Sequence, residues 1–221
     1  MSLMHSVCVQ VQCSLVALLL FAAIPANAAV LGVSGAVSII PAPADARLGM
    51  LESNTVAPLF TEVTGLKLPS NLTVDFNAPG TYNSNPGSLP FIPAGTVVDS
   101  YYLITDPVGS DVNNVRNFSG TITFSTDVLG VIVLDPEFAS SNGTLGHPGT
   151  LYSPAGIALE LGSPDTFTLS GGRRTISFSF SSNTAADNMR IVTAAVPEPA
   201  SAVLVVAGLA GVLLLRRRLQ V

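Results

Sequence analysis

Several kinds of catalytic centre are excluded by residues that this chain lacks. Its two cysteines, Cys8 and Cys13, lie near the amino terminus, so the chain after residue 28 has no disulfide, thiol nucleophile or cysteine-bound zinc of its own. His147 is the one histidine in that part of the chain. The sequence also has no G-x-S-x-G nucleophile elbow, no H-E-x-x-H zinc motif and no phosphate-binding glycine loop. These absences favour a protein without enzymatic activity.

Basic residues are scarce between residues 29 and 195. This region has six basic residues against thirteen acidic ones, which gives a net charge of −7. A protein that binds nucleic acid needs a basic surface to neutralise phosphates, so this charge argues against a nucleic-acid partner. A region of about 165 residues is long enough for one domain with its own hydrophobic core. We therefore expect residues 29–195 to form a single acidic domain.

The amino terminus has the pattern of a secretory signal peptide. Leu15 to Ile24 is an apolar run that Pro25 ends, and Ala26-Asn27-Ala28 supplies an A-x-A cleavage site before Ala29. The first ten residues contain no Lys or Arg, so the basic segment that usually opens such a leader is missing. We expect residues 1–28 to be a leader that is removed on export.

The carboxyl terminus has the pattern of a membrane span. Sixteen uncharged residues run from Ala200 to Leu215, and nine of them are Leu or Val. These nine favour insertion into a bilayer by about 3–5 kcal/mol. A helix of this length spans about 24 Å, and one that starts at Val196 spans about 30 Å, the thickness of the hydrocarbon core. Arg216, Arg217 and Arg218 follow, and the positive-inside rule places them in the cytoplasm as a stop signal.

The start of this tail resembles a known sorting signal. Val196-Pro197-Glu198-Pro199-Ala200-Ser201, followed by the apolar run and the three arginines, is similar to the PEP-CTERM signal of exported bacterial proteins. The resemblance covers residues 196–218 and implies that Pro197, Glu198 and Pro199 are recognised by an exosortase, a membrane-embedded protease. Two prolines keep such a segment extended and outside the helix, where a protease can reach it.

The resemblance also implies a route. The protein would cross the inner membrane with its carboxyl terminus left in the cytoplasm, and would then reach the cell surface or the extracellular matrix. Such proteins are typical of Gram-negative bacteria that make extracellular polysaccharide. We therefore expect residues 29–195 to be an exported domain and residues 196–221 to be its sorting tail.

Apolar and polar side chains alternate along several segments of the expected domain. In Thr175–Ser181 three apolar residues alternate with serines, and Asn117–Ser125 and Leu72–Phe76 repeat the pattern. Helical patterning is limited to one or two turns near Asp45–Leu51. We expect an all-β fold, an antiparallel β-sandwich of jelly-roll type, with a closed barrel as the alternative. Further β-branched or aromatic runs bounded by turn residues are Val97–Thr105, Val128–Leu134, Phe167–Leu169 and Met189–Thr193.

Two long connections, residues 78–94 and 139–155, are rich in Gly, Pro, Asn and Ser and are where we expect a ligand site. A shorter loop has a cluster of oxygen ligands that could hold Ca²⁺, although their spacing matches no EF-hand loop. The same residue types form ordinary turns, so a solvated turn is the alternative interpretation. The members of this cluster are Asp106, Asp111, Asn113 and Asn114.

Three other patterns have both a functional and a plain structural interpretation. Asp135 and Glu137 could form a carboxylate pair of the glycosidase kind, but Asp135-Pro136-Glu137 is also typical of a turn. His147 lies between a glycine and a proline, where a solvated turn residue is the usual case. The outward Ser and Thr residues of the expected strands could bind sugars or ordered water, or could simply face solvent.

These observations favour a non-enzymatic exported protein with a role in the cell envelope or the extracellular matrix. A carbohydrate-binding module, calcium-dependent through Asp106 and Asp111, is the second hypothesis. A secreted hydrolase that uses Asp135, Glu137 or His147 is the third. The expected partners are an exosortase-type protease, the membrane and extracellular polysaccharide.

Overall fold

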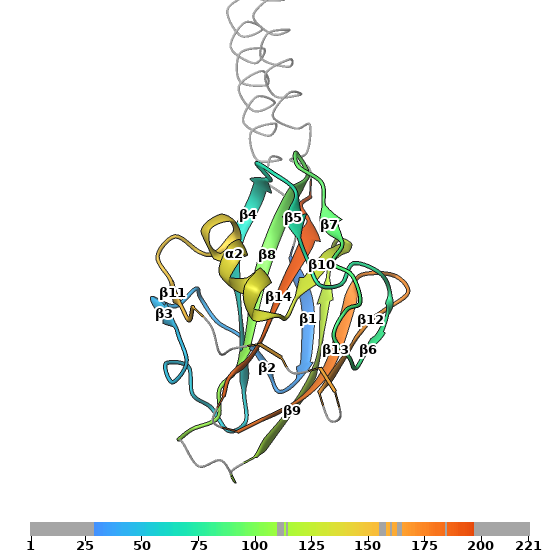
Figure 1. Ribbon diagram of the computed structural model, residues 1–221. Helices are drawn as coiled ribbons and strands as arrows, with labels where there is room; N and C mark the ends of the chain where they lie inside the picture. Colours follow the sequence, from blue (N-terminus) through green and yellow to red (C-terminus); the bar gives the residue numbers. More distant parts are fainter. Residues whose placement is uncertain are drawn as a thin grey trace, which may run out of the picture. The chain divides into compact units, whose positions relative to one another are not determined.

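The computed structural model describes residues 29–109, 113, 115–154, 158–159, 161–162, 165–183 and 185–196 (Figure 1). The expected leader, sorting motif, membrane span and arginine stop all lie outside these residues. Among the residues that are described, no helix is long and apolar enough to cross a membrane. A compact unit spans Ala28–Val196.

Two five-stranded sheets make up most of this domain. In the first, the strand order is β1 (Val30–Gly35), β9 (Arg116–Phe124), β13 (Thr175–Ser182), β12 (Thr166–Leu169) and β6 (Gly80–Tyr82). In the second, it is β10 (Val128–Ile132), β14 (Asp187–Ala194), β8 (Val97–Thr105), β4 (Ala57–Lys67) and β2 (Val37–Ile39). The remaining elements are the pair β3 (Asp45–Ala46) and β11 (Leu151–Tyr152), the pair β5 (Leu72–Thr73) and β7 (Phe91–Ile92), and helix α2 (Asp135–Leu145). The expected all-β class is confirmed.

The sheets are mixed rather than purely antiparallel. Strand β2 pairs with β4 in parallel, and so does β11 with β3, whereas the other strand pairs are antiparallel. Parallel neighbours need a long connection that returns the chain to the same end of the sheet. Residues 40–56 supply such a connection between β2 and β4. The prediction of an antiparallel fold is therefore wrong at these two pairs.

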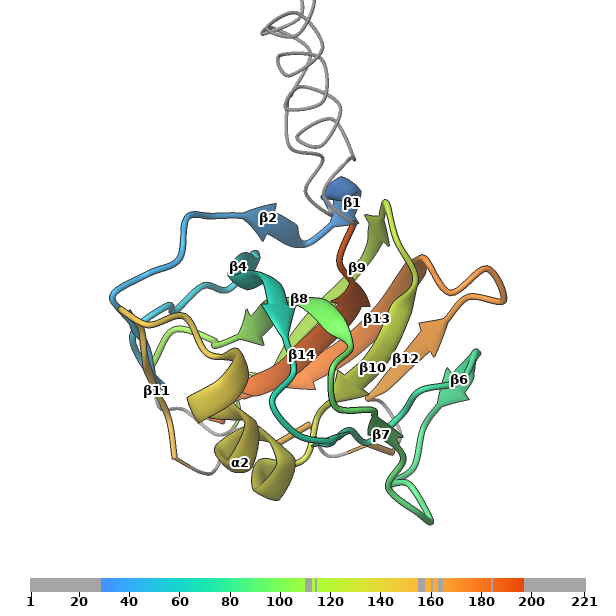
Figure 2. The same ribbon diagram turned by 90° about the horizontal axis from the view of Figure 1, so that it is seen from above.

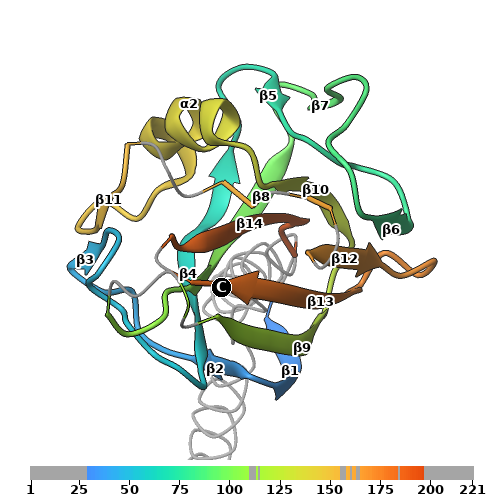
Figure 3. The same ribbon diagram turned by 60° about the horizontal axis from the view of Figure 1, so that its bottom comes forward.

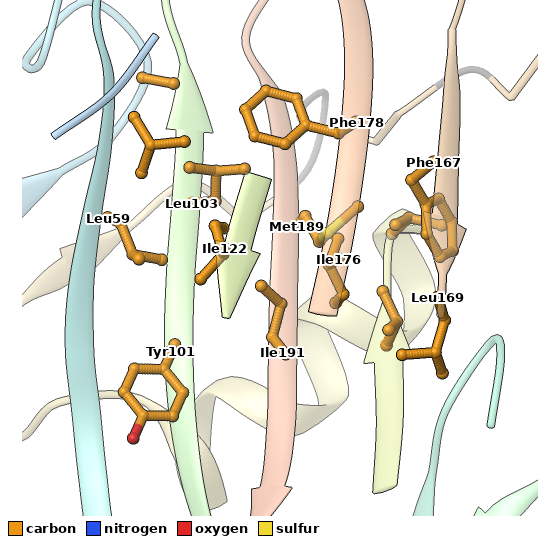
Figure 4. Packing of buried hydrophobic residues seen from close by; sticks show 14 of the residues in the cluster. Leu59, Tyr101, Leu103, Ile122, Phe167, Leu169, Ile176, Phe178, Met189 and Ile191 are labelled. Atoms are coloured by element: carbon orange, nitrogen blue, oxygen red, sulfur yellow. The ribbon is translucent and has the colours of Figure 1, made fainter. Parts of the chain in front are cut away.

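The two sheets enclose the main hydrophobic core (Figure 4). In β13, Ile176, Phe178 and Phe180 point inward, and Met189 and Ile191 of β14 face them from the second sheet. Successive side chains of a strand point to opposite faces, so an alternating sequence gives each strand one apolar face. Figure 3 shows β13 and β14 as neighbours in the two layers.

The second sheet is also covered on its outer face. Helix α2 and the β5–β7 pair lie over it (Figure 2), and Phe60, Tyr102, Phe138 and Val192 belong to a second buried cluster there. Strands β8 and β14 are therefore buried on both faces. In a strand that is buried on both faces, consecutive residues are buried, so its sequence lacks the alternation of apolar and polar residues that marks a strand with one exposed face.

Helix α2 was not expected. Asp135-Pro136-Glu137, interpreted above as a turn, is its first turn, where Pro136 occupies a position that needs no N–H donor and the two carboxylates face the positive end of the helix dipole. The loop expected at residues 139–155 accordingly begins as helix. Conversely, the helical turns expected near Asp45–Leu51 are absent, because Asp45–Ala46 is the short strand β3.

Candidate functional site

In the acidic loop that was expected to bind calcium, Asp106 accepts a hydrogen bond from a backbone N–H group. Asp106 is 2% exposed, and its Oδ2 accepts a hydrogen bond of 2.8 Å from the Gly49 N–H. Burial raises the pKa of Asp106, and the Gly49 hydrogen bond opposes this. Asn113 is exposed, and Asp111 lies outside the described residues. No three His, Cys, Asp or Glu side chains in the described part of the chain could hold a metal ion together, so calcium binding stays a prediction.

Two other buried aspartates hold backbone in the same way. Asp75 accepts hydrogen bonds from the N–H groups of Val133 at 2.6 Å and Leu134 at 2.9 Å. Asp99 accepts one from the Gly65 N–H at 2.6 Å. Burial raises the pKa of both carboxyl groups, because the charged form loses its hydration. Their hydrogen bonds identify them as acceptors for turns and strand ends.

The candidate hydrolase residues are not assembled into a catalytic arrangement. Asp135 and Glu137 stand two positions apart on α2, and residues at that spacing do not face each other on a helix. The Nδ1 atom of His147 lies 3.2 Å from the Gly149 N–H and 3.3 Å from the Thr150 hydroxyl oxygen, both within its own loop. The described geometry thus fits the turn interpretation of His147.

A buried ion pair under α2 is the feature that sequence reasoning missed. Arg190 of β14 and Glu62 of β4 have fully buried side chains. The Nε and NH2 atoms of Arg190 each donate to one Glu62 oxygen at 2.7 Å. The Ser100 hydroxyl also donates to Glu62, at 2.6 Å. The pair therefore crosses the second sheet with both carboxylate oxygens satisfied.

The same guanidinium group fixes the helix to the sheet. Its NH1 atom donates to the Ser141 hydroxyl at 2.6 Å, and its NH2 atom donates to the Asn142 amide oxygen at 2.9 Å. Three aromatic rings surround it, with centroids 5.4–5.6 Å from the guanidinium carbon, in the range of cation–π contacts. The rings belong to Tyr102, Phe138 and Tyr152.

Burial alone would lower the pKa of Arg190, but the charge and hydrogen bonds of Glu62 outweigh it and the pKa is raised. Burial raises the pKa of Tyr102 and Tyr152. All three groups therefore keep their protons at neutral pH. With every charged atom enclosed, this cluster holds α2 in place and offers no open site to a ligand.

The outer face of the first sheet carries an ordered array of hydroxyl groups. One row runs across all five strands in register, and its members are Ser34, Thr121, Ser177, Thr168 and Thr81. A second row crosses β9, β13 and β12 through Ser119, Ser179 and Thr166. Neighbouring strands lie about 4.8 Å apart and alternate residues of a strand about 7 Å apart, so the hydroxyl groups form a grid.

This hydroxyl face is open and uncharged. Within the long row, the Thr81 and Thr168 hydroxyl oxygens are 2.9 Å apart and those of Thr121 and Ser177 are 3.3 Å apart. Every outward residue of β6, β9, β12 and β13 is Ser, Thr or Asn, because the apolar alternates fill the core. The sequence predicted these polar rows, whereas their alignment into ladders depends on strand register, which the sequence pattern does not give.

Comparison with known proteins adds no assignment. No family model, curated protein or solved structure matches this chain. The resemblance of the tail to PEP-CTERM signals and the function that it implies therefore stay predictions.

Proposed function

We propose that this chain is an exported, non-enzymatic protein that an exosortase-type protease processes at its tail and that serves in the cell envelope or extracellular matrix. One observation carries the proposal: the Pro197-Glu198-Pro199 motif, an apolar run and an arginine cluster follow one another in the order of a sorting signal. The proposed route holds the protein transiently in the inner membrane, with Arg216–Arg218 in the cytoplasm, before its release to the surface.

The bounds of the folded unit support this division of the chain. The compact unit spans Ala28–Val196. The expected leader cleavage lies beside its first residue, and the sorting motif begins directly after its last one. A protease that cuts near Pro197 would thus release the domain without removing any part of its sheets.

We also keep the jelly-roll-like sandwich as a proposal for this domain, flanked by the signal peptide and the membrane helix. The chain passes directly from one sheet to the other between β1 and β2, between β8 and β9, between β9 and β10, and between β13 and β14. Repeated crossing between two facing sheets is typical of jelly rolls.

Replacing Pro197, Glu198 and Pro199 together by alanine is expected to block processing. The uncut protein should then stay at full length in the inner-membrane fraction, because the protease loses its recognition element while the membrane span is retained. Immunoblots of fractionated cells of an exosortase-bearing Gram-negative host would measure this. Pro148→Ala, which changes an exposed proline of the domain, is the matched control and should be processed normally. Unchanged cleavage and location of the triple variant would contradict the proposal.

The hydroxyl face favours a second candidate function, the binding of a neutral polysaccharide. Each hydroxyl group can donate and accept a hydrogen bond, so an uncharged grid of them complements a polymer that is itself rich in hydroxyl groups. The long row extends across five strands, so a polymer that lies along it could meet several hydroxyl groups in turn. The carbohydrate-binding function expected above would then reside on Thr121 and Thr168 rather than on the acidic loop.

Thr121→Val together with Thr168→Val tests this candidate, because valine keeps the β-branched shape and removes the hydroxyl group. We expect the double variant to bind an insoluble neutral polysaccharide about 5- to 150-fold more weakly, from two lost hydrogen bonds of about 0.5–1.5 kcal/mol each. Thr61→Val, at an exposed position of β4 in the other sheet, is the control. Equal retention of the double variant would contradict the candidate, and binding abolished by a chelator would instead implicate Asp106 and Asp111.

A further inference from the structure

Both ends of the folded domain lie at one corner of it. The Ala29 carbonyl accepts a hydrogen bond of 3.0 Å from the Ser125 N–H. Two residues further on, the Asp127 carbonyl accepts one of 2.9 Å from the Ala194 N–H, and Ala195 donates to the Val97 carbonyl at 3.1 Å. The chain therefore enters the domain at Ala29 and leaves it at Val196 beside the same short turn, Ser125–Asp127.

This corner is basic on a domain that is acidic. Lys67, which pairs with Val97 across β4 and β8, is exposed, and so is Arg174, whose Nε lies 3.1 Å from Asp127 Oδ1. Arg173 lies in the turn between β12 and β13, and its NH2 atom donates to the Asn77 carbonyl at 2.7 Å and to the Val128 carbonyl at 2.9 Å. Three of the six basic residues of an otherwise acidic domain thus gather here, beside one half-exposed carboxylate, Asp127.

Two large apolar side chains are exposed at the same corner. Leu31 is 66% exposed and follows Ala29 by two residues, and Val97 is 44% exposed beside the departing chain. Basic and apolar side chains together suit the interface of a bilayer, where the apolar groups enter the head-group region and the cations meet anionic lipids. We define the exit corner as Leu31, Lys67, Val97, Asp127 and Arg174.

The length of the tail brings this exit corner within reach of lipid. The chain advances by four residues from Val196 to Ala200, where the apolar run begins. Fully extended, they span at most about 14 Å. The head-group layer is about 5–7 Å thick on each side of the hydrocarbon core, and electrostatic attraction extends about 8 Å further at physiological salt.

We propose that the exit corner rests on the anionic head groups of the bilayer that holds the tail, so that the uncut domain has a fixed orientation on the membrane. This inference rests on the proposed function, because it requires a tail that is embedded in lipid. Removal of the leader after Ala28 would add the positive α-ammonium group of Ala29 to the corner. Docking would keep the Pro197-Glu198-Pro199 segment at the membrane face, where the protease is located.

Fluorescence quenching on the full chain tests the inference. Cys8 and Cys13 are first replaced by serine, and a single labelled cysteine is introduced as Val97→Cys, Val108→Cys or Val205→Cys. The proteins are reconstituted into vesicles that contain quencher-labelled lipid, with or without anionic phospholipid. Val108 is the matched control, because it is 47% exposed and follows the opposite end of β8 from Val97.

We expect the Val97 label to be quenched in anionic vesicles and the Val108 label to be spared. Lys67→Gln should lower the ratio of docked to undocked protein about fivefold, the effect of one cation near an anionic surface. Arg47→Gln, at an exposed site outside the corner, should not. Quenching at Val205 without quenching at Val97, or equal quenching at Val97 in neutral vesicles, would overturn the inference alone. An unquenched Val205 label would overturn the proposed function as well.

Discussion

Replacing Arg190 by methionine is expected to lower the free energy of unfolding by about 3–5 kcal/mol, the usual cost of leaving one member of a buried ion pair uncompensated. Arg190→Met would leave the Glu62 carboxylate without its charge partner. This carboxylate is fully buried and accepts two hydrogen bonds from the guanidinium group. It would also remove the bonds that hold Ser141 and Asn142 of α2 to the sheet. Urea denaturation followed by circular dichroism would measure the loss.

Two further variants separate the ion pair from general damage. Glu62→Leu combined with Arg190→Met removes both charges, and we expect the double variant to be more stable than Arg190→Met alone, because no uncompensated charge remains. Arg174→Met breaks the exposed pair with Asp127, whose side chains are 59% and 48% exposed, and should cost less than about 1 kcal/mol. Similar losses for Arg174→Met and Arg190→Met would show that burial does not determine the strength of these pairs.

Replacing Gly35 by alanine is expected to destabilise the domain by about 2–5 kcal/mol. Gly35 has a φ of +70°, which costs an L-residue about 1–2 kcal/mol, and its added Cβ would lie 2.2 Å from the Ser119 carbonyl oxygen, a clash that adds about 1–3 kcal/mol. The backbone would have to move where the end of β1 pairs with β9. Thermal denaturation should show a fall in Tm of about 4–20 °C.

Gly32→Ala provides the control on the same strand. A Cβ at Gly32 would meet nothing within 4 Å, and its φ is not positive. We expect a change within about 0.5 kcal/mol, as for most exposed substitutions. An equal loss for Gly32→Ala and Gly35→Ala would rule out the contact with Ser119 as the cause.

Local pattern predicted the strands whose two faces differ and missed elements that depend on distant partners. The alternation in β9 and β13 was sufficient because their inner faces meet one core and their outer faces meet water. Strand β4 was missed, since Glu62 places a charge in its middle and the cation that neutralises it lies 128 residues away in β14. Helix α2 was missed because it buries only Phe138, Ser141 and Leu145 and so has a weak apolar stripe.

The candidate sites divide in the same way. Residue type alone predicted the hydroxyl-rich strands, while cross-strand register decides that Ser34, Thr121 and Ser177 form one row. Asp106 was a candidate calcium ligand in the sequence, but in the folded chain it accepts a hydrogen bond from a backbone N–H group, as Asp75 and Asp99 do. Tertiary contacts, rather than spacing along the chain, determine which backbone N–H group donates to which carboxylate oxygen.

The position of β14 has a consequence for the order of assembly. It is the final strand of the domain, yet it lies between β10 and β8 in the interior of the second sheet. In a polypeptide that emerges with its amino end first, β8 and β10 keep unpaired edges until residues 187–194 arrive, and such edges promote aggregation. On the proposed export route, the second sheet would therefore close only after its last strand, which directly precedes Pro197-Glu198-Pro199, has crossed the membrane.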